Sequence, residues 1–360
     1  MHQSNLPWLI RGVCSLLILI NISLSKGHSQ DRDLFVSDAS HVVGTYQPAN
    51  VEHSTKAMVA SAQKFIDSLT AEQQQTVLYE ISDRERELWT NLPAREDAGG
   101  IRLGDLNQQQ VECLCDLMAR LLSSQGYEKI CNIMLADDQL LRNGRPRRGF
   151  GTENFSAVIF GTPSETEPWA FQIDGHHVGV NLAIEKDSLT MSPSFIGTQP
   201  HRFTIGNQEY VPFQKETDLA HQLAMSLTDD QVKSAVLKPR RAEILTGPGR
   251  DGQVPQQKGV SVSTFSESQK QNLIDLISQW VLDLPEPHAS KRMEQIKSEL
   301  DQVTFSWNGN RQPKSDVSYT IQGPSLIIEY ACQSLGNDPL DHLHSVYRDP
   351  TNEYGGQYKK

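Results

Sequence analysis

Alternating apolar residues near position 170 constrain the fold of this chain more than any other feature. Trp169, Phe171 and Ile173 are separated by smaller or polar residues, and a period of two is typical of a strand with one buried face. Asp174-Gly175 follows directly and favours a type I′ turn, because both positions of that turn need a positive φ. We therefore predict a β-hairpin with its turn at 174–175 and a return strand over 176–184.

The register of this hairpin follows from the turn. With two residues in the turn, Ile173 faces His176 and Phe171 faces Val178 on the apolar side of the sheet. His177 and Asn181 then fall on the polar side, where they are available for binding or catalysis.

Other segments also have the pattern of strands. A strand is predicted over 155–160, and a second hairpin over 203–211 is predicted around Gly206-Asn207. The C-terminal third carries further β-patterns, at 303–307, 319–321 and 326–330.

The remaining segments are predicted to be helical. Apolar residues at spacings of three and four indicate helices at 55–69, from about 105 to Gly126, and at 130–141, and later at 217–227 and 266–281. Thr70 with Gln73, and Thr228 with Gln231, each form a capping box that begins a further helix. The repeated Leu-Thr-x-x-Gln turn is common capping chemistry, and it indicates an internal duplication only weakly.

These patterns together predict an α+β fold. Its order is a helical N-terminal third, central β-hairpins, further helices and C-terminal strands in one mostly antiparallel sheet system. Residues 55–360 are expected to form a single domain, with two coupled lobes as the open alternative.

The N-terminus has the parts of an export signal. Arg11 precedes an apolar run over 13–20 that is too short to span a bilayer, and Ser23 and Ser25 are small residues suited to cleavage. We predict a signal peptide at 1–25, a poorly ordered leader at 26–54, and a secreted or periplasmic protein without a membrane span after cleavage. An uncleaved N-terminal anchor is the alternative.

Charge and cysteine content narrow the function. The formal net charge of −11 repels phosphate backbones, so nucleic acid is not an expected partner. Four cysteines follow the signal without CxxC spacing, and we expect buried or partly paired thiols: Cys113, Cys115, Cys131 and Cys332.

Common catalytic motifs are missing from the sequence. The segment 247–252 has the spelling GxGxxG, but Pro255 follows and no helix begins there to bind a phosphate. GxSxG, HExxH and P-loop patterns do not occur.

Histidines form the best candidate site. His342 and His344 are two residues apart, so on a strand both rings lie on one face, and His177 is expected on the polar face of the hairpin. Glu329 interrupts an apolar strand, where a buried carboxylate needs a partner or a metal. These four residues could hold Zn, Fe, Mn or Cu, with nitrogens roughly 3–4 Å apart for bonds of ~2.1 Å.

Other residues are given supporting roles. Arg348 and Asp349 are candidates for catalysis, Arg348 by holding an anionic part of a substrate and Asp349 as a general base or an orienting group. His176 and Asn181 are expected to support the ligands. A structural alternative stays open, in which the histidines are hydrogen-bonded core residues and Glu329 pairs with Arg348.

Several of these segments resemble one bacterial, usually exported family, domain of unknown function 3500. They are Phe160 to Ser164, Trp169 to Asn181 with its Gly-His-His, Ile321 to Pro324, Ile328 to Tyr330, and His342 to Gly355. The resemblance covers most of the mature chain, although Glu353 stands where we expect Asp in relatives. It supplies no activity, but it implies that seven residues belong to one motif set: His176, His177, Glu329, His342, His344, Arg348 and Asp349.

Two functions follow from these residues. The first is a metal-dependent enzyme, either a hydrolase that uses a metal-activated water or an oxidase. The second is a non-catalytic exported protein that binds a small acidic or saccharide ligand.

Overall fold

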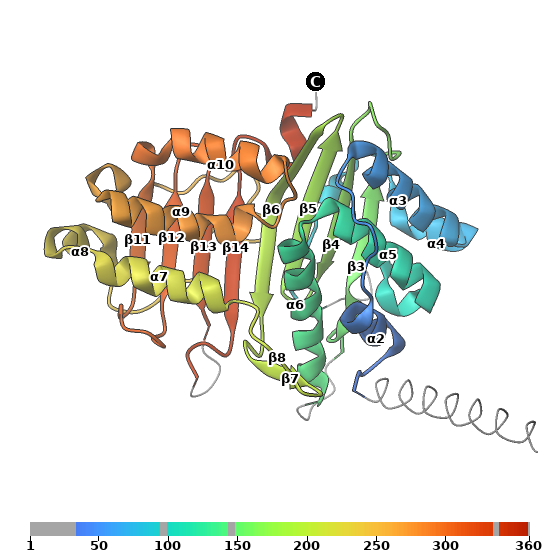
Figure 1. Cartoon of the computed structure of the whole chain (residues 1–360), viewed down its shortest axis with the longest axis horizontal. Coiled ribbons are helices and arrows are strands. Elements are labelled where there is room, and N and C mark those ends of the chain that lie inside the picture. The colour runs from blue at the N-terminus through green and yellow to red at the C-terminus, as the bar shows by residue number, and fades with distance from the viewer. Residues whose placement is uncertain (1–33, 94–98, 143–147, 334–337, 359–360) are drawn as a thin grey trace, which may run out of the picture.

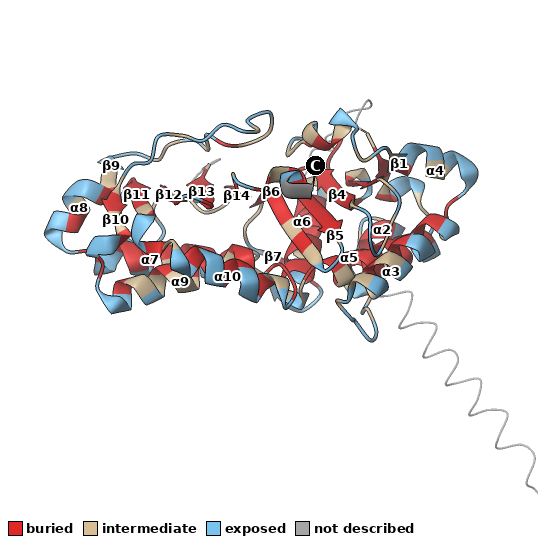
Figure 2. Ribbon diagram, turned by 90° about the horizontal axis from the view of Figure 1, so that it is seen from above, coloured by how far each residue is buried: buried red, intermediate tan, exposed pale blue. Residues whose placement is uncertain are grey.

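The computed structural model describes residues 34–93, 99–142, 148–333 and 338–358 (Figure 1). The predicted signal peptide at 1–25 and the first part of the predicted leader, 26–33, lie outside these ranges. One large sheet spans the described chain, and the long helices pack on one of its faces (Figures 1 and 2). The predicted α+β class is confirmed.

The helices are α2 Asp38–Thr45, α3 Thr55–Ser68, α4 Ala71–Val77, α5 Gln108–Leu121, α6 Ser124–Arg142, α7 Gln214–Ser226, α8 Asp229–Ala235, α9 Glu267–Val281 and α10 His288–Ser298. The strands of the first half are β1 Leu78–Tyr79, β2 Ile101–Arg102, β3 Ser156–Phe160, β4 Trp169–Gly175, β5 Val178–Glu185 and β6 Ser188–Thr198. Those that follow are β7 Phe203–Ile205, β8 Gln208–Tyr210, β9 Val236–Lys238, β10 Val260–Ser261, β11 Thr304–Asn308, β12 Ser318–Gln322, β13 Ile327–Cys332 and β14 Leu343–Arg348.

The large sheet is mostly antiparallel, as predicted. Its strand order is β1-β3-β4-β5-β6-β14-β13-β12-β11-β10, with β2 beside β3 and β9 beside β11. The pairs β1–β3 and β9–β11 are parallel. The predicted hairpin around Gly206-Asn207 forms as β7–β8, which is a separate small sheet.

The two halves of the sheet repeat one arrangement of elements. In the first half α3, α4, β1, β2, α5 and α6 precede four antiparallel strands, and in the second half α7, α8, β9, β10, α9 and α10 precede four more. Each half has one parallel and one antiparallel short strand on its outer long strand, β3 or β11. The halves join where β6 pairs with β14, so one continuous sheet runs through both.

Paired glutamines repeat with the elements. The capping-box residue Gln73 bonds to Gln110, the capping-box residue of α5, and Gln110 donates to the oxygen of Ser68 at the end of α3. In the second half Gln231 bonds to Gln269, and Gln269 donates to the oxygen of Ser226. The repeated Leu-Thr-x-x-Gln turn is therefore part of a structural duplication, which the sequence pattern indicated only weakly.

The β4–β5 hairpin differs from its predicted register. Its two-residue turn is His176-His177, because Gly175 pairs with Val178. Ile173 consequently faces Val180 instead of His176, and Phe171 faces Leu182 instead of Val178. The shift keeps every buried apolar residue on the same face, so the hydrophobic pattern alone did not distinguish the two registers.

Two other expectations also differ from the structure. Gly126 lies inside α6 and does not end a helix; an added Cβ would lie 2.5 Å from the oxygen of Asp283, so the glycine allows a close approach of backbones. The described part of the expected leader contains α2, whose Val42 and Val43 are buried against the core.

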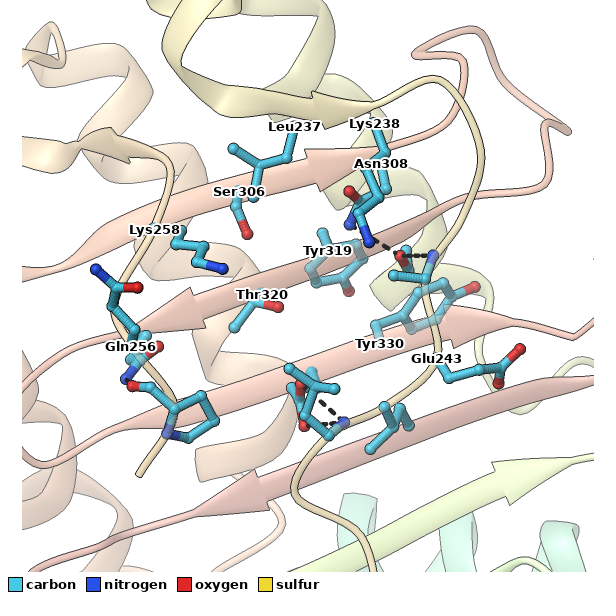
Figure 3. Close-up of a pocket in the computed structure, with 17 residues that line it drawn as sticks. Leu237, Lys238, Glu243, Gln256, Lys258, Ser306, Asn308, Tyr319, Thr320 and Tyr330 are labelled. Atoms are coloured by element: carbon cyan, nitrogen blue, oxygen red, sulfur yellow. Dashed lines mark hydrogen bonds between the residues drawn. The ribbon is translucent and has the colours of Figure 1, made fainter. Parts of the chain in front are cut away.

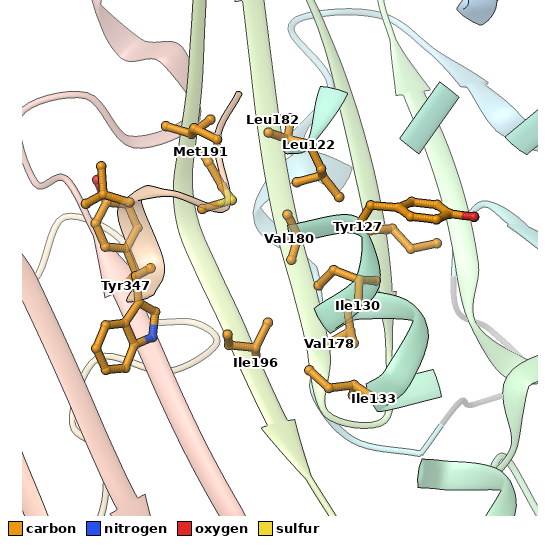
Figure 4. Close-up of a cluster of buried hydrophobic side chains, with 14 of the residues drawn as sticks. Leu122, Tyr127, Ile130, Ile133, Val178, Val180, Leu182, Met191, Ile196 and Tyr347 are labelled. Carbon is orange, nitrogen blue, oxygen red and sulfur yellow. The ribbon is translucent and has the colours of Figure 1, made fainter. Parts of the chain in front are cut away.

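The main core lies between the helices and the sheet. Figure 4 shows Ile130 and Ile133 of α6 directed at Val178 and Val180 of β5. Figure 2 shows this buried layer between the sheet and the helices, while irregular segments lie on the other face. The helices thereby cover one face of the sheet, and the ends of its strands are available to position functional side chains.

Candidate metal centre

Three histidines meet at the end of β14. The Nε2 atoms of His177 and His342 are 2.8 Å apart, and those of His342 and His344 are 3.0 Å apart. The three residues form a group in which one ligand atom from each lies within 4.8 Å of the others, which suits a metal ion. The predicted same-face pair His342/His344 and its meeting with His177 are both found.

The β4–β5 turn places His177 in this group. Its φ is 69°, a left-handed conformation that is uncommon for a residue with a side chain. The backbone N–H of His177 donates to Asn91, and its oxygen accepts from the N–H of Gly197 on β6. These two bonds fix the turn beside the end of β6, so His177 acts from the turn and not from a polar strand face as predicted.

Hydrogen bonding alone does not explain the three nitrogens well. Each neutral imidazole Nε2 has one position in the ring plane, which holds either a proton or a lone pair. His342 Nε2 lies within hydrogen-bond distance of two other Nε2 atoms, so one proton or one lone pair would serve both contacts. Three lone pairs directed at one cation would satisfy all three nitrogens. A zinc ion ~2.1 Å from each needs separations of about 3.4 Å, so the rings would move apart by only a few tenths of an ångström.

The surroundings keep the imidazoles neutral. Burial, reinforced by the neighbouring imidazoles, lowers the pKa of His177 well below its usual range. Burial also lowers the pKa of His342 to about 4 and that of His344 to about 3. Neutral imidazole is the form that binds metal. His177 is buried, whereas His342 and His344 are partly exposed, so the group is open to solvent on one side.

His176 supports His177 from the helix side of the sheet. The ring centroids of His176 and His177 are 3.7 Å apart, and those of His176 and Phe150 are 4.5 Å apart. His176 Nδ1 lies 2.5 Å from a carboxylate oxygen of Asp137, whose other oxygen accepts from the N–H of Gly151. His176 therefore lies against His177, and its expected role in supporting a metal ligand stays a prediction.

Asp137 was missed by the sequence reasoning. It lies on α6, and together with Asp138 it is buried within a helix whose neighbouring residues are apolar. Adjacent acids in such a stripe are costly to bury, which is the sequence feature that could have identified them. Asp137, His176 and His177 form a second group able to hold an ion, but His176 Nδ1 and both Asp137 oxygens already have partners.

Glu329 lies apart from the histidines. It is buried on β13, and its carboxylate accepts hydrogen bonds from the N–H groups of Leu245 and Thr246 and from the Thr246 hydroxyl. These bonds satisfy the buried charge, so the expected role of Glu329 as a metal ligand is not supported. The alternative, in which Glu329 pairs with Arg348, is not found either, because Arg348 pairs with Asp251 and Glu353.

Arg348 and Asp349 lie at the opposite end of β14 from the three histidines. Arg348 is four positions beyond His344, which is about 13 Å along a strand. Arg348 pairs with Asp251 and Glu353, and Asp349 pairs with Arg292. The structure therefore does not bring these two proposed catalytic residues to the histidines.

Asn181 is also remote from the three histidines. It accepts a hydrogen bond from Gln172 and donates to the oxygen of Pro193 within the sheet. Cys113, Cys115, Cys131 and Cys332 are buried free thiols and contribute no ligand to the group.

A family model described as a protein of unknown function (DUF3500) matches residues 51–356, most of the chain. The chain belongs to this family. The matched range includes the three histidines and Asp137, and the expected resemblance to this family is confirmed. No curated protein and no solved structure matches the chain. In the part of the chain that the structure describes, no helix is long and apolar enough to cross a membrane.

Proposed function

We propose that this DUF3500 protein binds one transition-metal ion through His177, His342 and His344. The observation that carries the proposal is the meeting of three Nε2 atoms at separations of 2.8 and 3.0 Å. Imidazole suits Zn²⁺, Cu²⁺ and Fe²⁺, and three protein ligands leave a coordination position for water or a substrate. The partly exposed sides of His342 and His344 give that position access to solvent.

A centre of this kind supports metal-dependent catalysis. A bound ion would lower the pKa of a coordinated water or, if redox-active, exchange electrons with a substrate. The chain supplies three neutral imidazole nitrogens, and because His177 is buried, solvent is excluded from its side of the group. A hydrolase and an oxidase therefore both remain within the proposal, and the identity of the metal separates them: Zn²⁺ favours hydrolysis, whereas Fe or Cu favours oxidation. The proposal includes export of the chain by its segment 1–25.

Metal analysis of the purified protein tests the binding step. We expect about one metal ion per chain by elemental mass spectrometry, lost in His344→Ala and in His177→Asn. Asn is chosen at 177 because it tolerates the left-handed backbone there better than Ala does. His201→Ala, which changes a histidine outside the group, is the matched control and should keep its metal. Metal far below one per chain in the parent, or full retention in both site variants, would contradict the proposal.

A further inference from the structure

A pocket lies on the face of the sheet opposite the helices, in the second half of the molecule. Its volume is about 230 Å³, and the chain between β9 and β10 forms walls on two sides of it (Figure 3). At ~30 Å³ for each water in the liquid, this is the space of roughly eight waters. It therefore fits a single sugar ring or a small hydroxy acid.

The floor of the pocket is polar. Ser306 and Asn308 of β11 and Thr320 of β12 point from the sheet into it (Figure 3). Asn308 as a whole residue is 7% exposed. Its amide nitrogen donates to Ser318, but its amide oxygen is buried and has no hydrogen-bond partner within the described residues. A buried amide oxygen without a donor costs free energy, and a ligand hydroxyl would satisfy it once the amide of Asn308 turns toward the cavity.

The duplicated fold shows that this polarity is not required by the sheet. Asn308 pairs with Lys238 and Ser318, just as Phe160 in the first half pairs with Tyr79 and Ala170. Phe160 and Asn308 are thus equivalent positions.

Other positions of the pocket follow the same equivalence. Ser306, which pairs with Thr320, corresponds to Val158, which pairs with Gln172. In the first half Val158, Phe160 and Ala170 belong to a buried apolar cluster, against which Tyr79 packs. The same backbone therefore carries apolar side chains at these two β-strand positions in one half, and polar side chains that line a cavity in the other.

The charge in the pocket favours an anion. Lys238 and Lys258 line it, and Figure 3 shows Lys258 reaching toward Ser306 and Thr320. Of the two acids in the wall, Glu243 pairs with Arg241, and Glu329 directs its carboxylate at the backbone N–H groups of Leu245 and Thr246. Two lysines thus line the cavity of a protein whose overall net charge is −11.

We propose that this pocket binds a small anion that carries hydroxyl groups, such as an acidic monosaccharide or a hydroxycarboxylate. Lys258 and Lys238 would attract the anionic group, while Ser306, Thr320 and the free oxygen of Asn308 bond the ligand hydroxyls. The site is separate from the histidine group, and none of its lining residues belongs to that group.

Calorimetric titration of the full chain in chelator tests the pocket, with D-glucuronate as the probe. Two further titrants separate its requirements: D-glucose has the hydroxyls without the charge, and acetate has the charge without the hydroxyls. We expect saturable binding of glucuronate and binding at least tenfold weaker for the other two. Absence of saturable glucuronate binding overturns the proposal. Equal binding of glucose overturns the anionic requirement, and equal binding of acetate overturns the hydroxyl requirement.

Variants locate the binding. Lys258→Gln removes one charge, and Ser306→Val introduces the residue of the equivalent position in the first half; each should weaken glucuronate at least tenfold. Lys233→Gln, an exposed lysine on α8, is the charge control and should bind as the parent does. His344→Ala should also bind normally, which separates failure of this pocket from failure of the metal centre. Unchanged binding in both pocket variants overturns the assignment.

Discussion

Gly197 lies so close to the ring of His344 that a side chain would not fit between them. An added Cβ would lie 2.9 Å from Cδ2 of His344, 3.1 Å from Cδ2 of His177 and 2.6 Å from the oxygen of Leu343. Gly197 belongs to β6, the strand that separates β5 from β14. Its missing side chain leaves the space in which the imidazole of His177, from the β4–β5 turn, meets that of His344, from β14.

We therefore expect Gly197→Ala to weaken metal binding. The new methyl group would collide with both rings and with the oxygen of Leu343, and would displace the imidazoles from a shared ion. Loss of comparable support around metal ligands typically costs 10–100-fold in affinity. Competition titration with a chromogenic chelator measures the effect. Gly247→Ala is the matched control, because an added Cβ there meets nothing within 4 Å. Equal affinities for the Gly197→Ala protein and the parent would show that the rings tolerate the methyl group.

Local patterns predicted much of the fold and part of the centre. The capping boxes at Thr70 and Thr228 and the same-face pair His342/His344 depend on contacts within a few residues, and each is found. The position of the β4–β5 turn was wrong by two residues, because an even shift leaves the apolar face unchanged.

Contacts between distant segments were harder to predict from the sequence. Asp137 reaches His176 only because α6 packs across β5. The sequence pattern around Asp137 gives no sign of His176, and the pattern around His176 gives no sign of Asp137. Arg348 and Asp349 are close to His344 in the sequence, yet an extended strand carries them to its other end. The prediction that Arg348 and Asp349 act beside the histidines rested on their proximity in the sequence. A strand rises by about 3.3 Å per residue, which explains why they lie apart.

Asp137 is expected to support metal binding without contacting the metal. Its carboxylate holds the ring of His176, which stacks on His177. In Asp137→Asn an amide replaces the charged acceptor, so we expect metal affinity to fall about tenfold. Asp138→Asn changes the neighbouring buried acid, which bonds Thr152 and not a histidine, and should keep the parent affinity. The same chelator competition measures both, and a larger loss in Asp138→Asn would argue against this chain of contacts.

A buried lysine joins the two halves on the helical side. Lys129 Nζ of α6 lies 2.9 Å from Glu216 of α7 and 3.0 Å from Asp283, and all three side chains are buried. We expect Lys129→Met to lower the free energy of unfolding by about 3–5 kcal/mol, because two carboxylates lose their counter-charge. Urea denaturation at neutral pH measures this change.

Two variants check that the loss arises from unpaired charge. Adding Glu216→Gln and Asp283→Asn to Lys129→Met should recover most of the stability, since no buried charge then remains in the group. Lys64→Met removes an exposed lysine that pairs with Asp116 and should cost less than about 1 kcal/mol. A triple variant as unstable as the single one would indicate that packing, and not charge, dominates.

Asp174 should make stability depend on pH. Burial raises the pKa of this carboxyl to about 7, although the N–H of Thr90 donates to it. Between the ordinary pKa of 3.8 and about 7, the folded chain keeps a proton that the unfolded chain releases. The contribution of Asp174 to stability is therefore fully present below pH 3.8, falls as the pH rises, and is lost above about 7.

Asp174→Asn removes this titration while keeping an acceptor oxygen for Thr90. We expect the variant to exceed the parent in the free energy of unfolding by about 1–3 kcal/mol at pH 8, and the excess to shrink steadily toward pH 4. Urea denaturation of both proteins at several pH values gives the difference directly. Asp67→Asn, at an exposed acid on α3, should give a nearly constant difference over the same range. A difference for Asp174→Asn that stays constant or grows as the pH falls would mean that the folded protein holds this carboxyl ionised.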